Sequence, residues 1–177
     1  MRLLKVLGGD NLVEDYKRWR SLRCKSFLRM FLTLPEFRIL CFYRMRRKNR
    51  FFRLLLLPLK LFNCHSLFIA CTDIGTGFFI EHGFSTIIAC RHIGRNCWIN
   101  QQVTIGFSNK TDSPFIGDDV QIKAGAKIIG NVVIGDDVIV GANSVVVKDI
   151  PSHSIVVGVP AKIIKQRSKI DEDWKKI

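Results

Sequence analysis

Residues 74–146 read IGTGFFIEHGFSTIIACRHIGRNCWINQQVTIGFSNKTDSPFIGDDVQIKAGAKIIGNVVIGDDVIVGANSVV, and this stretch decides the fold. Branched aliphatic residues recur through it at a nearly constant spacing: Ile74, Ile80, Ile87, Ile93, Ile99, Ile105, Ile116, Ile122, Ile128, Ile134, Val140 and Val146. Nine of the eleven intervals between them are six residues long. A period of six fits neither an α-helix nor a simple strand, whose side-chain periods are about 3.6 and 2.

A unit of six residues is one short strand plus one turn, and such a unit cannot bury its aliphatic side chain alone. The units must therefore stack into a solenoid. A smaller residue recurs four places after many of the aliphatic residues and is expected to fill the corner of the wall: Cys97, Val103, Val120, Ala126, Val132, Val138 and Ser144. Two further sets suit turns that need a positive φ. They are the glycines Gly94, Gly117, Gly135 and Gly141, and the Asn or Asp residues Asn96, Asp119, Asp137 and Asn143.

The period is broken at two places. One residue is added between Ile80 and Ile87, where the chain reads Glu81-His82-Gly83, and five are added before Ile116, within residues 106–115. The wall of a solenoid needs neither insertion. Irregular loops on a rigid scaffold are where binding and chemistry concentrate, so we expect functional residues in both.

The positive charge is concentrated at the start of the chain. The formal net charge is +13 over 177 residues. Residues 1–60 hold sixteen Lys and Arg against four acids, whereas the remainder holds twelve against eleven. The chain therefore divides into a basic front segment and a nearly neutral solenoid.

The front segment is expected to be helical. Asn11 suits an N-cap for a helix over residues 12–31, and Pro35 suits the first turn of a second helix that ends near Arg47. The apolar run 51–62 reads as a short helix broken near Pro58. A basic cluster lies between them: Arg46, Arg47, Lys48 and Arg50.

Arginines interleaved with Phe and Leu favour a segment that lies in a membrane interface. Two other interpretations are a helical cap on the open end of the solenoid and a nucleic-acid surface. Large apolar residues exceed what phosphate binding needs, so we expect no nucleic acid, while cap and membrane contact are compatible. The run 51–62 is too short and too charged to span a bilayer, and no secretory signal is recognisable.

The cysteines and histidines indicate no metal site. Six cysteines form no CxxC pair, so reduced thiols in a cytoplasmic protein are expected: Cys24, Cys41, Cys64, Cys71, Cys90 and Cys97. Three histidines on neighbouring coils could bind zinc, but the spacings from His65 to His82 and from His82 to His92 do not stack them.

Four segments resemble the hexapeptide acyltransferases: residues 74–83, 100–106, 124–130 and 158–164. Within that family, IGTGFFIEHG at residues 74–83 is similar to a run found in serine acetyltransferases. The resemblance covers about residues 74–165. It implies a left-handed β-helix of triangular cross-section, a homotrimer and acetyl-CoA as donor. The front segment is more like acetyltransferases of capsule, O-antigen and exopolysaccharide synthesis.

His82 is the candidate catalytic residue. Transfer of an acetyl group to a hydroxyl needs a base that takes the hydroxyl proton, and a free imidazole has a pKa of about 6.5. In the family that the chain resembles, the histidine at this position is the general base and transfer is direct. The resemblance also implies donor-binding residues, which are Gly106, Ala124, Ala142, Lys148, Lys162 and Lys165. Small residues let the pantetheine arm approach the wall, and lysines suit the phosphates.

Two departures from serine acetyltransferases bear on the acceptor. That family has an aspartate fifteen residues before the histidine, which orients it, and here Leu67 stands there. The family's Arg-His before a proline holds the serine carboxylate. Here Asp112-Ser113 precede Pro114, and an acid would repel a carboxylate. A saccharide hydroxyl needs no such clamp.

The sequence therefore predicts a mainly β, left-handed parallel β-helix with an α-helical N-terminal segment. Residues 1–61 form the basic segment, 62–165 the β-helix and 166–177 a tail. We expect an acetyl-CoA-dependent O-acetyltransferase acting on a surface polysaccharide or its precursor, peripheral at the inner face of a bacterial cytoplasmic membrane. The alternatives are a serine O-acetyltransferase and a non-catalytic trimeric scaffold.

Overall fold

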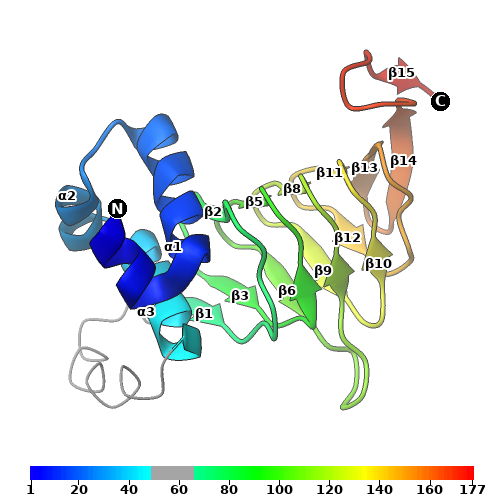
Figure 1. Ribbon diagram of the computed structural model, residues 1–177. Coiled ribbons are helices and arrows are strands. Elements are labelled where there is room, and N and C mark those ends of the chain that lie inside the picture. The colour runs from blue at the N-terminus through cyan, green and yellow to red at the C-terminus, as the bar shows by residue number, and fades with distance from the viewer. Residues whose placement is uncertain (49–65) are drawn as a thin grey trace.

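The computed structural model describes residues 1–48 and 66–177. A helical segment lies at one end of a long β-solenoid, and the C-terminus lies at the other end (Figure 1). The predicted helix over residues 51–62, with Arg50, Cys64 and His65, falls outside the described residues.

Within residues 1–48 the front segment has three helices: α1 Arg2–Arg23, α2 Phe27–Thr33 and α3 Pro35–Lys48. The prediction of a single helix over residues 12–31 is wrong. Helix α1 begins earlier, at Arg2, bends at Gly9 (φ 77°) and ends where Cys24 takes a left-handed conformation (φ 51°). Ser26 then starts α2 by accepting a hydrogen bond from the Arg29 amide. The helix predicted from Pro35 is confirmed.

The solenoid has three parallel sheets, which are its three walls. The first wall holds β1 Leu67–Ile69, β3 Thr86–Ile88, β6 Thr104–Gly106, β9 Lys127–Ile129 and β12 Val145–Val146. The second holds β4 His92–Ile93, β7 Phe115–Ile116 and β10 Val133–Ile134. The third holds β2 Phe79–Ile80, β5 Trp98–Ile99, β8 Gln121–Ile122, β11 Ile139–Val140 and β13 Ser154–Gly158. Each coil visits the third, first and second wall in turn.

The predicted inward residues fill the core, with one exception. The small corner residues are buried, as expected. Ile87, however, is 45% exposed, while its neighbour Ile88 is fully buried and pairs with Ile105. Phe68, which pairs with Ile87, is 59% exposed and lies on the same outer face. Adjacent aliphatic residues cannot be distinguished by spacing, because either can face inward.

The turns use glycine and Asn or Asp for different reasons. Asn96, Asp119, Asp137 and Asn143 all have φ between 53° and 57°, which confirms the predicted left-handed positions. The positive φ predicted for the glycines that follow the aliphatic residues is wrong, and these glycines are needed instead for close approach of the coils. A Cβ on Gly94 would lie 2.5 Å from the carbonyl carbon of Gly117 on the next coil.

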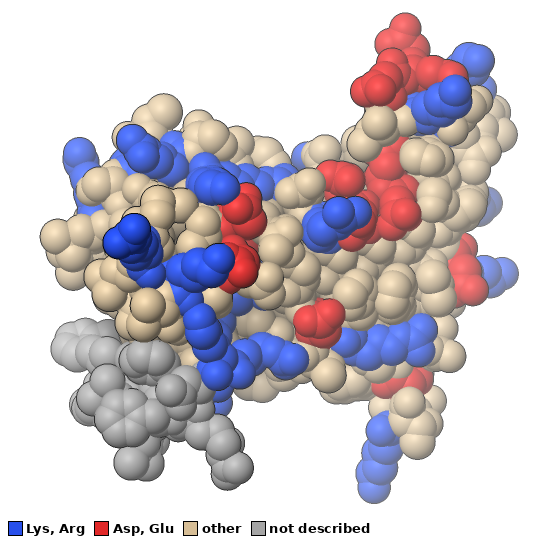
Figure 2. Space-filling model, in the orientation of Figure 1, with Lys and Arg blue, Asp and Glu red and all other residues tan. Residues whose placement is uncertain are grey.

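The helical segment covers the first coil through buried polar contacts. Arg44 pairs with Asp15 (Nε to Oδ2 2.7 Å) and donates to the carbonyl oxygens of Ile74 and Gly75. The Trp19 indole donates to the Phe78 carbonyl at 2.8 Å. Burial raises the pKa of Asp15 although the Arg44 charge opposes that rise. Many Lys and Arg side chains lie on the outer surface of this end (Figure 2).

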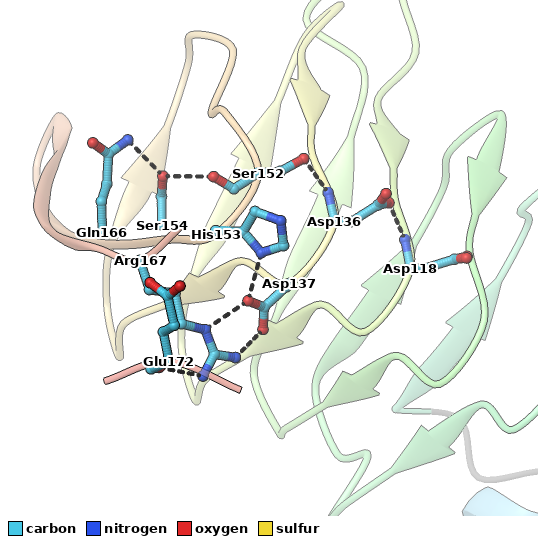
Figure 3. A network of polar contacts seen from close by, with 9 residues as sticks. All are labelled: Asp118, Asp136, Asp137, Ser152, His153, Ser154, Gln166, Arg167 and Glu172. Carbon is cyan, nitrogen blue, oxygen red and sulfur yellow. Dashed lines mark hydrogen bonds and ion pairs between the residues drawn. The ribbon is translucent and has the colours of Figure 1, made fainter. Parts of the chain in front are cut away.

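The chain reverses direction at the far end. β14 Ala161–Gln166 runs antiparallel to β13, so residues 161–166 are not another parallel coil, and β15 Lys175–Lys176 adds to β14. Asp137 holds this hairpin, because Arg167 donates two hydrogen bonds to it (2.6 and 2.8 Å) and His153 Nδ1 lies 2.8 Å away (Figure 3).

Candidate active site

His82 lies in the turn between β2 and β3, at the corner between the third and first walls. Its side chain is exposed and its backbone is left-handed, with φ of 53°. For a residue other than glycine this conformation costs about 1–2 kcal/mol, so its surroundings must hold it. Its carbonyl accepts a hydrogen bond from the Phe84 amide at 2.7 Å. The turn therefore lifts the imidazole away from the wall, where a substrate can reach it.

The next residue is held by the helical segment. The Gly83 amide donates to Glu36 Oε1 at 3.1 Å, across forty-seven residues of sequence. A Cβ on Gly83 would meet Glu36 Cγ at 2.9 Å and Leu67 Cδ2 at 3.1 Å. Glu36 is not among the site residues predicted from the sequence. A single acid in the first turn of a helix carries no signal that links it to a distant loop.

Polar groups gather beside His82 on the third wall. Glu81 accepts a hydrogen bond from the Asn100 amide nitrogen at 3.2 Å and lies 3.6 Å from the Arg23 guanidinium. Within the described part of the chain, four buried polar atoms lack a hydrogen-bond partner: Arg23 Nε, Trp98 Nε1, Asn100 Oδ1 and Gln101 Oε1. Unpaired buried polar atoms are costly, and a bound polar ligand would satisfy them.

Two predicted donor-binding residues share the corner of His82. Backbone hydrogen bonds join successive turns at this corner. The amides of Glu81, Gly125 and Asn143 donate to the carbonyl oxygens of Ile99, Gln101 and Ala124, respectively. These bonds stack the turn of His82 on the turns of Gln101, Ala124 and Ala142. Neither alanine is buried, so both present little more than backbone to an approaching ligand.

Lys162 lies at the far end of this edge. Lys162 pairs with Val157 of β13. Val157 in turn lies against Gly141, since its Cγ1 would be 2.6 Å from a Cβ added there. Lys162 and Lys165 are both exposed on β14. The edge therefore runs from the imidazole at one end to Lys162 at the other, whose charge suits a polyanionic donor. Lys165 pairs with Ile155, which pairs with Ile139, so it lies farther from this corner.

Gly106 and Lys148 lie at a different corner, which joins the first and second walls. Gly106 ends β6 and pairs with Ile129, and Lys148 follows β12 on the same side. The width of the first wall separates them from His82 within one chain. The structure thus does not bring these two predicted residues together with the catalytic histidine.

The long insertion is braced by its own aspartate. Asp112 accepts hydrogen bonds from the amides of Ser108 (2.8 Å) and Asn109 (3.1 Å) and from the Ser108 hydroxyl. The Ser108 hydroxyl bond in particular lowers the pKa of Asp112. These hydrogen bonds favour the ionised carboxylate, so Asp112 keeps its negative charge within the loop.

The other described histidines are paired elsewhere. His92 Nδ1 lies 3.1 Å from Asp73, and its ring stacks on Phe115 at 4.6 Å in the second wall. His153 belongs to the cluster around Asp137. Among residues 1–48 and 66–177, no three His, Cys, Asp or Glu side chains are grouped as a metal site would require. The cysteines described there are free thiols.

Comparisons with known proteins find relatives of similar sequence and similar fold. The family model described as bacterial transferase hexapeptide (six repeats) matches residues 113–148. Serine acetyltransferase of Staphylococcus xylosus is 49% identical over 99 residues, which are 53% of this chain and 45% of that protein. Soybean serine acetyltransferase complexed with serine is 31% identical, with a TM-score of 0.76 over 90% of this chain and 70% of that one. The Neisseria gonorrhoeae enzyme is 30% identical, with a TM-score of 0.74 over 89% and 66%.

A left-handed β-helix of hexapeptide repeats with N-terminal helices is therefore confirmed. The chain belongs to the hexapeptide-repeat transferase family, and the relatives described above are serine acetyltransferases. It spans about half the length of the curated relatives it matches. The particular likeness to capsule and O-antigen acetyltransferases finds no support among these relatives.

Proposed function

We propose that this protein is an acetyl-CoA-dependent O-acetyltransferase in which His82 is the general base. The observation that carries the proposal is the shared edge of the exposed His82 imidazole and the small residues Ala124 and Ala142. The imidazole takes the proton of the acceptor hydroxyl while the hydroxyl oxygen attacks the thioester carbonyl carbon. The carbon–sulfur bond breaks, and the imidazolium returns the proton to the departing thiolate.

The relatives' names favour serine as the acceptor. A saccharide hydroxyl is the second candidate, and one observation favours it. Asp112-Ser113 stand where the resemblance places the residues that hold the serine carboxylate.

The test is release of the CoA thiol from acetyl-CoA, measured separately with serine and with an oligosaccharide. We expect His82→Ala to fold normally and to lose activity by about 10²–10⁴-fold. His92→Ala is the matched control, because this histidine lies on another wall, and it should keep its activity. Near-normal turnover by His82→Ala would disprove the assignment. No turnover by the unmodified protein with either acceptor would favour the scaffold alternative.

A homotrimer is part of the proposal. Phe68 and Ile87 are paired on the outer face of the first wall, and Phe84 is exposed in the turn that carries His82. A neighbouring copy would cover this apolar surface and bring Gly106 and Lys148 of one wall toward the edge of the next. Sedimentation at micromolar concentration should show a trimer, and a fully active monomer would contradict it.

Membrane contact through the front segment is proposed on its outer surface. Leu28 and Leu32 of α2 are exposed beside Arg29, and so is Leu3 of α1. Arg44 and the other bases that hold the cap are not available for lipid. No helix in the described ranges is long and apolar enough to cross a membrane. Flotation with anionic liposomes at low salt should carry the full chain, but not a chain that lacks residues 1–61. If neither protein floats with the liposomes, the proposed contact of this protein with the cytoplasmic membrane is wrong.

A further inference from the structure

The backbone of His82 is fixed from outside the solenoid. One peptide unit joins His82 to Gly83, and both of its polar groups are hydrogen-bonded. The carbonyl accepts from the Phe84 amide at 2.7 Å, and the amide donates to Glu36 Oε1 at 3.1 Å. Because a left-handed residue is held only by its surroundings, this peptide sets the direction in which the imidazole leaves the turn.

The first strand offers apolar packing at this point and no carboxylate. Leu67 stands where the resemblance places an orienting aspartate, and it is buried beneath the turn, close to Gly83. The carboxylate of Glu81 is engaged by Asn100 and Arg23. The acid that bonds to the backbone of this turn therefore comes from α3.

The helix presents Glu36 in a fixed place. Glu36 lies between Pro35, which starts α3, and Phe37, which is fully buried with its ring 5.1 Å from the ring of Trp19. Further along α3, Arg44 is bonded to the carbonyls of the first coil. A side chain that is placed before the substrate arrives loses little freedom in the reaction, which is what a positioning residue requires.

We propose that Glu36 is the positioning residue of His82, acting through the Gly83 amide in place of an aspartate on the first strand. The inference rests on the proposed function, since it requires His82 to act as the base. The front segment is then part of the active site as well as a cover for the first coil. What the Gly83 amide requires is an acceptor oxygen at this reach, which the side chain of Glu36 supplies.

Two substitutions separate the effect of the length of the Glu36 side chain from the effect of its charge. Glu36→Asp keeps the charge and the acid in the first turn of α3, but its side chain is one methylene shorter and no longer reaches Gly83. Glu36→Gln loses the charge but keeps an oxygen that can accept from the Gly83 amide. We expect kcat of Glu36→Asp to fall by about 10- to 100-fold at unchanged KM for acetyl-CoA, and kcat of Glu36→Gln to stay within about threefold. Glu14→Gln, on the exposed face of α1, is the control and should leave kcat unchanged.

Amide hydrogen exchange provides a readout independent of turnover. The Gly83 amide should exchange slowly in the full-length protein and in Glu36→Gln, and faster in Glu36→Asp. The inference is overturned if Glu36→Asp keeps its kcat, or if Glu36→Gln loses as much as Glu36→Asp. If the unmodified protein acetylates no hydroxyl, the proposed function fails. Hydrogen exchange then still decides whether Glu36 holds the turn.

Discussion

The buried pair of Asp15 and Arg44 should carry a large share of the attachment between helices and solenoid. Neither side chain is exposed by more than 3%. Asp15 also accepts a hydrogen bond from the Phe78 amide at 3.0 Å. Asp15→Ala would leave the guanidinium without a counter-charge and the Phe78 amide without an acceptor. Loss of one partner from a buried ion pair costs about 3–5 kcal/mol, and we expect a decrease of that size in the free energy of unfolding.

A double-mutant cycle isolates the pair. Arg44→Met should cost a similar amount, because it leaves a buried carboxylate and removes donors from the carbonyls of Ile74 and Gly75. The double variant should cost less than the sum, since no unpaired charge remains. Its backbone groups stay unsatisfied, so it should not return to the original stability.

Urea denaturation followed by circular dichroism and by tryptophan fluorescence measures these changes, since Trp19 is buried between the rings of Phe37 and Phe79. Lys17→Ala is the control, because its pair with Glu14 is exposed and should be worth less than about 1 kcal/mol. The reasoning is refuted if either single variant of the buried pair costs under about 1 kcal/mol, or if the two costs are simply additive.

Two further predictions concern the His82 turn and the far end of the solenoid. Gly83→Ala should lower the free energy of unfolding by roughly 1–3 kcal/mol and reduce kcat, because its Cβ would lie 2.9 Å from Glu36 Cγ. Unchanged urea midpoints and turnover would contradict this. Burial opposes ionisation of Asp137, but hydrogen bonds from Arg167 and His153 lower its pKa. Its stabilisation should be present above about pH 4 and be lost as the pH falls through the lower folded value. Urea midpoints at about pH 5 and about pH 3 should therefore differ more in the unmodified protein than in Asp137→Asn.

The repeating wall could be predicted because each unit obeys a local rule. An inward aliphatic residue, a small corner residue and a left-handed Asn or Asp recur within six positions, and each is satisfied by the neighbouring coil. The prediction was wrong at Ile87, where Ile88 faces inward instead. Two adjacent isoleucines give the same signal, and the choice depends on the length of the turn before them.

Contacts between distant segments could not be predicted in this way. Glu36 and Arg44 read as ordinary charges of a basic helix, and their partners lie about thirty to fifty residues away in the sequence. His82 was recognisable because it interrupts the period. Gly106 was grouped with it by resemblance, yet a single chain places the two at different corners. Residue spacing fixes which residues share a wall, whereas a site across corners depends on assembly.

The two ends of the solenoid pose the same physical problem and receive different solutions. A terminal coil exposes unpaired strand groups and an apolar interior, which must be covered. At the far end the last coil is covered by the hairpin of β13 and β14, which follows it directly in the sequence. At the first coil the cover is the helical segment, which also carries Glu36 to the His82 turn. Stability of that end and the position of the imidazole are therefore coupled. Variants that loosen the pair of Asp15 and Arg44 should reduce turnover before they unfold the rest of the solenoid.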